Sequence, residues 1–391
     1  MTKINKKQFI WDFMQKNIMP DCYNSLKFNN YSHNINSVNG NNAPINIIGL
    51  FPTYITPSIF DENKKAFYKI KQSKLDGAGI LIDMVYNDMD SYMNKNFKSN
   101  FRGRIKKCIS RLETCFNIHY EYNYGEITHE KCEFLLAELK AMLEKRFEEK
   151  ETSNYFLNNW NNNTKNTFSL INENKASLFV IYSNSTPISI CLNYHKFNNL
   201  FFYYQASYDL SYSKFGLGHI NVYKFVEWSL KHHYKFIDFG NGILHYKKQW
   251  CNTFYGFEYH MIFDKRNLKA SMVALVETCK ITCKNLAKNL NMDLVYHKMK
   301  QIMLKNKNTQ QTVLPSYKTT HLKQAKFNSD ILNDYSITDI AHINTNLKRT
   351  IFDFLFLNKE HINNVSIYKA NKTNEYLVFG LENAAEINLT A

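Results

Sequence analysis

Arginine, glycine and proline are scarce in this 391-residue chain, and each scarcity excludes a class of protein. Glycine (12) and proline (6) are too few for a collagen-like or low-complexity linker protein. Only six of the 49 basic residues are arginine, although planar two-point recognition of phosphates and base edges favours arginine over lysine. The net charge of +15 therefore does not by itself indicate a nucleic-acid-binding protein.

Long hydrophobic runs and paired cysteines are also missing. No stretch approaches the roughly 18 apolar residues of a membrane span, and the start of the chain lacks the apolar run of a signal peptide. The eight cysteines are scattered without a CxxC pair, which favours reduced thiols over disulfides or a zinc site. We therefore expect a cytoplasmic protein with no metal and no membrane span.

The chain nevertheless has enough apolar sequence to build a core. Its apolar fraction of 44% is ordinary for a globular protein, and its length predicts two or three domains. The charge is uneven, because residues 265–326 hold thirteen basic residues and two acidic ones. We divide the chain into an α/β part (1–96), a central domain (97–264), a basic helical segment with a linker (265–326) and a small acidic part (327–391).

Hydrophobic periodicity predicts most elements of the first two parts. An Asn-rich tract at 29–46 is typical of a surface loop. Helices are expected over Asp61–Lys74, Phe101–Glu113, Glu130–Glu149 and His219–His233. Strands are expected over Ile45–Leu50, Gly79–Tyr86, Asn117–Tyr122, Ser177–Tyr182, Ile188–Tyr194, Leu200–Ser207, Phe236–Phe239 and Tyr255–Phe263.

The basic segment begins with a predicted amphipathic helix. Apolar residues recur at intervals of three and four, and lysines lie on another face. The apolar positions are Leu268, Met272, Leu275, Cys279, Cys283, Leu286 and Leu290, and the lysines are Lys280, Lys284 and Lys288. Residues 305–330 are polar and predict a linker, and strands are expected over Val365–Tyr368 and Tyr376–Leu381.

The strongest functional signal lies within 200–250. A predicted strand and turn lead to Gly216-Leu-Gly218 at the first turn of a predicted helix. Glycines there let backbone N–H groups approach a ligand, and a helix N-terminus favours an anion, so the turn is a candidate pyrophosphate site. No GK[ST] follows, and Asn221 stands where a Rossmann motif needs glycine, so neither of these nucleotide motifs is present. An ordinary turn is the alternative.

Several segments resemble one known family. They are YYQASYDLSYSKFGLG, FVEWSLKHHYKFIDFGNG and HYKKQW, with FRGRIKKCISRLE and LEKRFEEK upstream. Together, over about residues 97–263, they resemble the GNAT-fold acyltransferases, in the branch near the Fem-type peptidyl transferases and CelD-like proteins. The resemblance implies an α/β (α+β) fold with a mixed, mostly antiparallel sheet flanked by helices, and makes the N-terminal part a candidate degenerate GNAT-like half. Ser213 departs from the family's Arg or Gln.

The resemblance also implies a donor site. The family moves an acyl group from a thioester, acetyl-CoA or another acyl-CoA, to an amine, with the donor's pantetheine arm between two splayed strands. The pyrophosphate would lie on backbone amides of the turn formed by Lys214, Phe215, Gly216, Leu217, Gly218 and His219. Lys214 would pair with a phosphate, or else be a solvated side chain.

Acyl transfer to an amine needs an acid for the thiolate and a base for the amine. Tyr246 follows the family's Asp-x-Gly strand and is the acid candidate, with a packed aromatic as the alternative. Asp209 and His219 are the base candidates. Asp209 also suits a turn cap, and a helix N-terminus would lower the pKa of His219 even in a structural role.

Three further residues are candidates for binding the acceptor. Asp238 and the pair Lys247 and Lys248 match the family's Asp-x-Gly and Tyr/Phe-Lys-Lys segments. The alternative for Asp238 is a buried carboxylate bonded to backbone N–H groups. The alternative for Lys247 and Lys248 is two surface charges. Cys251 is a poor nucleophile candidate because no neighbouring base is implied.

Three functions follow, in order of preference. The first is an N-acyltransferase that uses acyl-CoA and acts on an amine of a small molecule, sugar or peptide. The second keeps the fold but takes aminoacyl-tRNA as donor, with tRNA bound by the basic segment 265–326. The third is a non-catalytic binding protein, suggested by Ser213. The lysine face after residue 265 also suits RNA, anionic lipid, another protein or plain solvent.

Overall fold

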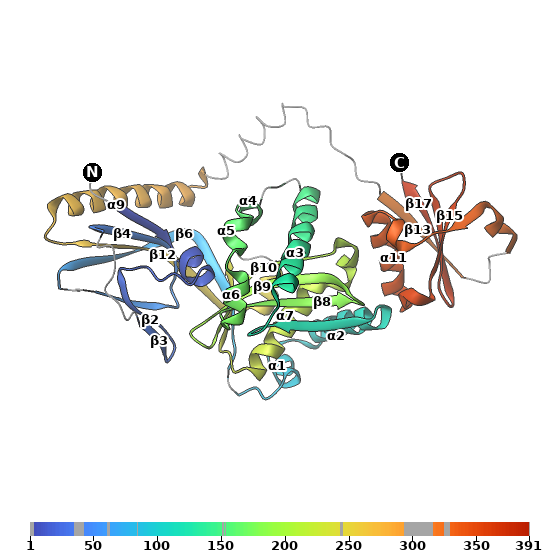
Figure 1. The fold of residues 1–391 in the computed structure, drawn as a ribbon, viewed down its shortest axis with the longest axis horizontal. Helices are drawn as coiled ribbons and strands as arrows, with labels where there is room; N and C mark the ends of the chain where they lie inside the picture. Colours follow the sequence, from blue (N-terminus) through green and yellow to red (C-terminus); the bar gives the residue numbers. More distant parts are fainter. Residues whose placement is uncertain are drawn as a thin grey trace, which may run out of the picture.

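A computed structural model shows one large sheet with helices on both faces and a small separate unit at the C-terminal end (Figure 1). It describes residues 4–34, 43–60, 63–83, 85–150, 152, 154–242, 245–292, 316–323 and 329–390.

Nine of the strands in these ranges form one mixed sheet. In order across the sheet they are β1 (Ile4–Gln8), β4 (Ile45–Pro52), β12 (Thr253–Asp264), β6 (Lys65–Leu81), β11 (Phe236–Asn241), β10 (Leu200–Tyr208), β9 (Thr186–Lys196), β8 (Ala176–Ser183) and β7 (Ile118–Asn123). The pairs β1/β4 and β10/β11 are parallel and the others antiparallel. The predicted α/β fold with a mixed, mostly antiparallel sheet is confirmed.

The N-terminal strands belong to this same sheet. β6 lies between β11 and β12, and β4 pairs with the other edge of β12. The division expected at residue 96 therefore crosses one continuous sheet. A three-stranded sheet of β2 (Tyr23–Phe28), β3 (Tyr31–Asn34) and β5 (Thr56–Ile59) lies beside it, so part of the predicted loop at 29–46 is strand, and 35–42 lie outside the described residues.

Helices cover both faces of the sheet. They are η1 (Ile10–Gln15), α1 (Met89–Asn96), α2 (Ser99–Cys115), α3 (His129–Glu149), α4 (Tyr155–Asn158), α5 (Trp160–Thr164), α6 (Thr167–Asn172), α7 (Leu217–Lys231), α8 (His245–Trp250) and α9 (Leu268–Asn289). Successive residues of β8 point to opposite faces, so Phe179 packs in the core under α2 and α7 and Val180 in the core under α3. Figure 1 shows α3 on one face and α2 and α7 on the other.

Most of the predicted elements are confirmed, but the helix expected over Asp61–Lys74 is wrong. Residues from Lys65 onward form β6, which ends at Leu81, short of the strand end expected at Tyr86. β6 pairs with β12 and then with β11, both distant in sequence. These long-range hydrogen bonds override a local pattern that is also compatible with a helix.

The C-terminal unit is a five-stranded sheet with one longer helix. In sheet order its strands are β13 (Ser316–Lys323), β17 (Asn383–Thr390), β16 (Glu375–Phe379), β15 (Ser366–Ala370) and β14 (Tyr335–Ile337), and the helix is α11 (Thr345–Asn358). Short 3₁₀ turns are η4 (Ser329–Asp334), η5 (Ile340–His342) and η6 (Ile362–Asn364). The predicted linker at 305–330 is wrong over β13, which pairs with β17, while 305–315 and 324–328 lie outside the described residues.

One feature of the large sheet positions the site. The parallel strands β10 and β11 pair only from Leu200 to Phe202. β10 continues to Tyr208 and carries an irregularity in its pairing with β9 between Tyr203 and Gln205. The sheet therefore opens between these two strands, and the edge of β10 that faces the opening has lost its strand partner.

Candidate active site

A cavity of about 510 Å³ lies where β10 and β11 separate. Its walls come from β10, β11, the turn before α7, the end of α3, α8 and the N-terminal η1. The lining residues are Ile10, Trp11, Arg146, Phe202, Tyr203, Tyr204, Ala206, Tyr208, Ser213, Gly216, Gly218, His219, Asn221, Phe239, Gly240, Asn241, Tyr246 and Lys247. The cavity can take an elongated ligand along an open strand edge.

The glycine turn forms one end of this cavity. Gly216 has φ +70° and caps α7, a left-handed conformation that favours glycine. Leu217 and Gly218 are the first helical residues, whose N–H groups the helix itself cannot satisfy. A Cβ added to Gly218 would meet no atom within 4 Å, so this backbone borders open space. The turn therefore has the geometry of an anion site at a helix N-terminus.

Not every residue of the predicted donor turn contributes a side chain. Phe215 is fully buried and packs against Phe116 and Phe356, with ring centroids 5.4 and 5.2 Å away. Leu217 is also buried. The side chains of these two residues pack in the core beneath the turn, so only their backbone groups are placed to bind a ligand.

His219 lines the cavity with its proton fixed on one nitrogen. The indole N–H of Trp250 donates to Nδ1 of His219 over 2.9 Å, and an indole nitrogen can only donate. The neutral imidazole therefore carries its proton on Nε2. Burial, with a smaller effect of Arg104, lowers the pKa of His219. This tautomer suits hydrogen-bond donation from Nε2 to a ligand better than removal of a proton.

Tyr246 lines the cavity from α8, and its ring lies 6.5 Å from that of Phe239. Burial raises the pKa of the Tyr246 phenol above its usual value. The hydroxyl therefore stays protonated at neutral pH and can donate a proton or hydrogen bond inside the cavity. This placement is compatible with the predicted acid.

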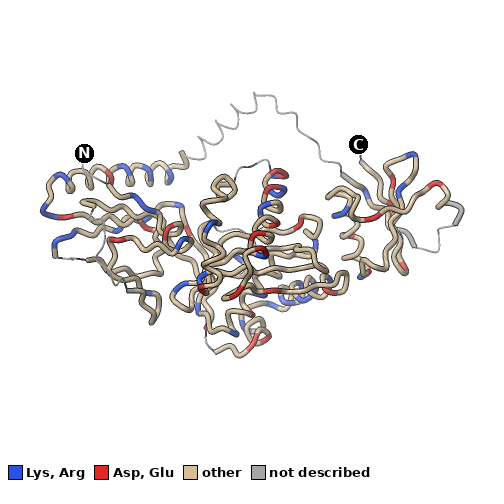
Figure 2. The backbone as a smooth tube through the Cα atoms, viewed as in Figure 1, with Lys and Arg blue, Asp and Glu red and all other residues tan. Residues whose placement is uncertain are grey.

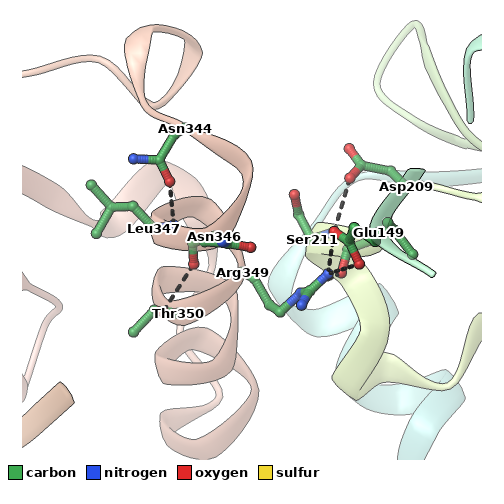
Figure 3. Close-up of polar contacts among 9 residues, drawn as sticks. Glu149, Asp209, Ser211, Asn344, Asn346, Leu347, Arg349 and Thr350 are labelled. Atoms are coloured by element: carbon green, nitrogen blue, oxygen red, sulfur yellow. Dashed lines mark hydrogen bonds and ion pairs between the residues drawn. The ribbon is translucent and has the colours of Figure 1, made fainter. Parts of the chain in front are cut away.

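Asp209 precedes η2 (Leu210–Phe215) as its N-cap residue (Figure 3). It is not one of the residues that line the cavity. Its Oδ1 accepts a hydrogen bond from the Ser211 N–H at 2.9 Å, the geometry of a turn cap. Its Oδ2 is 3.7 Å from the Lys348 ammonium of α11. These contacts are those of a residue that orders the turn, and the role of base stays a prediction for both Asp209 and His219.

The C-terminal helix α11 contacts η2 at several points. The Arg349 Nε donates to the carbonyl oxygen of Leu210 at 3.0 Å, and its Nη2 lies 3.2 Å from the Glu149 carboxylate (Figure 3). The predicted phosphate partner Lys214 instead pairs with Asp353 of α11 at 3.3 Å. α11 thus links η2 to the end of α3.

Asp238 is fully buried and is not part of the cavity wall. It accepts hydrogen bonds from the Tyr54 hydroxyl at 2.6 Å, the Tyr255 hydroxyl and the Gly240 N–H at 2.7 Å. Burial raises the pKa of Asp238, and these bonds and the Lys247 charge oppose that rise. Its carboxylate joins β11 to β12 and to the N-terminal segment after β4, so an acceptor would have to displace one of these bonds to reach it.

The two lysines after Tyr246 lie in different surroundings. Lys247 is buried at the cavity wall, where its ammonium donates to the carbonyl oxygens of Phe239 at 2.7 Å and Asn241 at 3.1 Å. Burial lowers the pKa of Lys247. These bonds join α8 to the end of β11. Lys248 is exposed and does not line the cavity.

Arg146, Trp11 and Ile10 also line the cavity and are not among the predicted site residues. Arg146 lies in the last turn of α3, and its guanidinium lies 5.5 Å from the centroid of the Tyr208 ring. Trp11 stacks on Tyr155 at 4.9 Å. The segment LEKRFEEK contains Arg146 and could have indicated it, whereas no local signal marks residues 10 and 11.

Other catalytic chemistry has little support here. Burial raises the pKa of the Cys251 thiol to about 12, which leaves very little thiolate at neutral pH. Within the described ranges, no group of three or more His, Cys, Asp and Glu side chains is placed to hold a metal ion. In the same residues, no helix combines the length and apolar character needed to cross a bilayer.

One family model matches the chain. It is the acetyltransferase (GNAT) domain, and it covers residues 99–248, which contain the cavity wall from α3 to α8. A comparison with curated proteins gives no match.

The solved structures to which the chain is similar include three with low sequence identity. A conserved protein of unknown function from Bacteroides thetaiotaomicron is 12% identical, with 56% of this chain and 70% of that chain covered and a TM-score of 0.39. A functionally unknown conserved protein from Staphylococcus epidermidis is 10% identical, with 57% and 73% covered and a TM-score of 0.29. FemX is 10% identical, with 59% and 75% covered and a TM-score of 0.38.

Proposed function

We propose, from the premise that residues 99–248 form a GNAT-type acetyltransferase domain, that this protein transfers an acyl group from acyl-CoA to an amine. The observation that carries the proposal is the cavity between the separated parallel strands β10 and β11, closed at one end by the glycine turn of α7. This shape accommodates a long donor with an anionic end and an extended arm. We place the reaction in the cytoplasm, where acyl-CoA is formed.

The donor is proposed to bind along β10. Its pyrophosphate accepts hydrogen bonds from the N–H groups of Leu217 and Gly218 and from Nε2 of His219. The pantetheine amides pair with the free edge of β10 beyond Phe202, as an added strand would. The acyl thioester then lies near the far end of the gap, beside Tyr246 and Lys247.

Tyr246 is proposed to handle the proton of the reaction. The amine nitrogen attacks the thioester carbonyl, the C–N bond forms and the C–S bond breaks. The Tyr246 hydroxyl gives its proton to the departing sulfur and regains one from the nitrogen. Acyl-CoA and amine thus become amide and free CoA, with no other reactant. Asp209 and Lys214, held by α11, keep the donor turn ordered in this proposal.

The acceptor is proposed to be an amine of a small molecule, sugar or peptide. It would enter at the end of the cavity lined by Tyr204, Tyr208 and Trp11, whose rings suit a sugar face or an apolar side chain. Arg146 lies at the same wall and can pair with a carboxylate or phosphate on the acceptor. Lys247 acts by holding β11 in place.

The test is acyl transfer by the full chain. Acetyl-CoA is incubated with a panel of amino sugars, amino acids and short peptides, and acetylated product and free CoA are measured by mass spectrometry. Gly218→Trp serves as the donor-blocked control. Product formed by the wild type alone supports the proposal. Transfer only from aminoacyl-tRNA would overturn the choice of donor, and donor binding without transfer across the panel would favour a non-catalytic binding protein.

A further inference from the structure

Helix α9 turns its apolar stripe toward solvent. The opposite face of the helix packs against strands β6 and β12 through Ala270, Ala274 and Ile281. The predicted apolar positions are therefore on the outside, where the aliphatic ones are from 56% to 78% exposed. These outward residues, here called the α9 stripe, are Leu268, Met272, Leu275, Cys279, Cys283, Leu286 and Leu290.

The spacing of the α9 stripe fits a flat surface. Its members are separated by 4, 3, 4, 4, 3 and 4 residues, so the average interval is near the 3.6 residues of a straight α-helix. A left-handed coiled coil with another helix would need a repeat of 3.5. The stripe consequently runs parallel to the helix axis along about 33 Å, at 1.5 Å per residue.

Lysines border the stripe on one side. Residues 265–292 contain six basic residues and one acidic residue, Glu277. Glu277 lies on the inner side of the helix and pairs with Lys6 at 2.7 Å and Lys280 at 2.9 Å. Figure 2 shows the basic residues along α9 at the outer edge of the molecule. An occupant of this face must therefore be apolar at its centre and anionic at its border.

An apolar groove of about 640 Å³ continues the stripe on its other side. It lies between α9 and strands β6 and β12, and Leu275, Tyr68 and Phe263 are among its lining residues. Tyr68 is 56% exposed and stacks on Phe263 at 5.8 Å. Tyrosine favours surfaces where an apolar phase meets water. The apolar face is thus wider than the helix alone.

We infer that α9 is a peripheral membrane-binding helix that lies on an anionic lipid surface. Leucine and methionine side chains of the α9 stripe enter the acyl boundary, and Lys269, Lys280 and Lys284 contact acidic headgroups. Nucleic acid is a poorer occupant, because its phosphates would meet leucines at the centre of the face. A second copy of the chain would bring the same charge, and with antiparallel helices would set lysines against lysines.

The test is binding of the full chain to vesicles. Vesicles of phosphatidylcholine alone and with about 30% phosphatidylglycerol are sedimented with the protein, and the bound fraction is measured. We expect binding to the anionic vesicles that weakens with added salt. No binding to anionic vesicles, or equal binding to both kinds, would overturn the inference.

Two sets of variants separate the apolar and charged contributions. Replacing Met272, Leu275 and Leu286 with Gln should abolish vesicle binding. Replacing Lys269, Lys280 and Lys284 with Gln should lower it about 100-fold, because each basic residue near an anionic surface contributes roughly fivefold. The matched control replaces the exposed Lys165, Lys231 and Lys372 with Gln and should bind as the wild type does. Unchanged vesicle binding in the variant that lacks Met272, Leu275 and Leu286, here called the leucine variant, would overturn the inference.

The cysteines give an independent readout. All eight lie in the described ranges, and only Cys279 and Cys283, both in the α9 stripe, are exposed. A polarity-sensitive thiol dye on Cys279 in a Cys283→Ser background should shift to shorter wavelength with anionic vesicles. The same dye on Lys372→Cys, with both stripe cysteines replaced by serine, should not shift. An unshifted dye at Cys279 would contradict insertion.

Two other results would also overturn the inference. One is tight binding of bulk tRNA that is lost in the lysine variant while no vesicles are bound. The other is a stable dimer in light scattering that the leucine variant dissociates, again with no vesicle binding. Thermal unfolding should be the same for wild type and variants, since every replaced side chain is exposed.

Discussion

Tyr246 is the residue on which the proposed proton transfer depends. Tyr246→Phe removes one hydroxyl from the cavity wall and leaves the ring packing in place. We expect turnover to fall about 100-fold or more, as for loss of a general acid, with donor affinity unchanged. Steady-state kinetics and a separate donor titration measure the two effects. Tyr31→Phe, at an exposed tyrosine in β3, is the control, and full activity in Tyr246→Phe would remove Tyr246 from the mechanism.

The buried His195 should make the free energy of unfolding depend on pH. Burial lowers the pKa of His195 to about 3, whereas an unfolded histidine has a pKa near 6.5. Between these values the unfolded chain binds a proton that the folded chain does not. The His195 contribution to the free energy of unfolding therefore falls as the pH drops below about 6.5, by roughly 1.4 kcal/mol per pH unit.

Urea unfolding between about pH 4.5 and 7 measures this slope. His195→Gln can keep the hydrogen bond that Nε2 shares with the Ser177 hydroxyl at 2.9 Å, but it does not titrate. Below about pH 6.5, the free energy of unfolding of His195→Gln should fall less steeply with decreasing pH than that of the wild type. The difference should be roughly 1.4 kcal/mol per pH unit. Equal slopes would show that His195 takes up its proton while folded.

The cavity could be predicted in part at the scale of residues. Gly216, Gly218, His219, Tyr246 and Lys247 line it. The first three follow from a local turn and helix signal, whereas Tyr246 and Lys247 are predicted only from the resemblance to the GNAT family. Side-chain directions could not be predicted in the same way. Phe215 and Asp238 are buried because of aromatic and hydroxyl partners that are remote in sequence, and Arg146 and Trp11 reach the cavity only through tertiary packing.

At the scale of elements, α11 supports η2, which leads into the proposed donor site. Arg349→Ala removes its bonds to the Leu210 carbonyl and to Glu149. Because both groups of the Arg349–Glu149 pair are partly exposed, we expect the free energy of acyl-CoA binding to become less favourable by about 1 kcal/mol. This change corresponds to roughly fivefold weaker acyl-CoA binding. Lys372→Ala, at an exposed lysine of the same unit, should leave the affinity unchanged. Equal affinities in all three proteins would mean that η2 does not need α11.

The hydroxyl of Tyr255 connects β12 to the buried Asp238 on β11. Tyr255→Phe leaves that carboxylate with one donor fewer in a site without solvent. We expect the free energy of unfolding to fall by about 1–3 kcal/mol in urea titrations. Tyr68→Phe, at an exposed tyrosine of β6, is the matched control and should be neutral. A neutral Tyr255→Phe would contradict the assignment of Asp238 as a connecting residue.

Elements with strong local signals could be predicted, and elements formed by distant pairing could not. The meander of β8, β9 and β10 and the helices α3 and α7 follow from their periodicity. β6 and β13 depend on partners far along the chain, β12 and β17, which no local window contains. The apolar stripe of α9 predicts a helix correctly, but the side that packs on the sheet is its alanine-rich face.

At the scale of the whole molecule, the site is assembled from three parts of the chain. The central domain supplies the strand gap and the glycine turn, the N-terminal part supplies η1 and the Asp238 partner Tyr54, and α11 fixes η2. The two flanking parts therefore act on the same cavity that residues 99–248 build. The relation of the N-terminal part to a second GNAT-like half stays a prediction.

The most direct test of the central claim is calorimetric titration of the full chain with acetyl-CoA. We predict saturable binding by the wild type, moderate weakening in Gly218→Ala and no binding in Gly218→Trp. Thermal unfolding should be equal in all three, because a side chain at position 218 meets no atom of the protein within 4 Å of its Cβ. Absence of binding by the wild type, or unchanged binding by Gly218→Trp, would contradict a donor site at this turn.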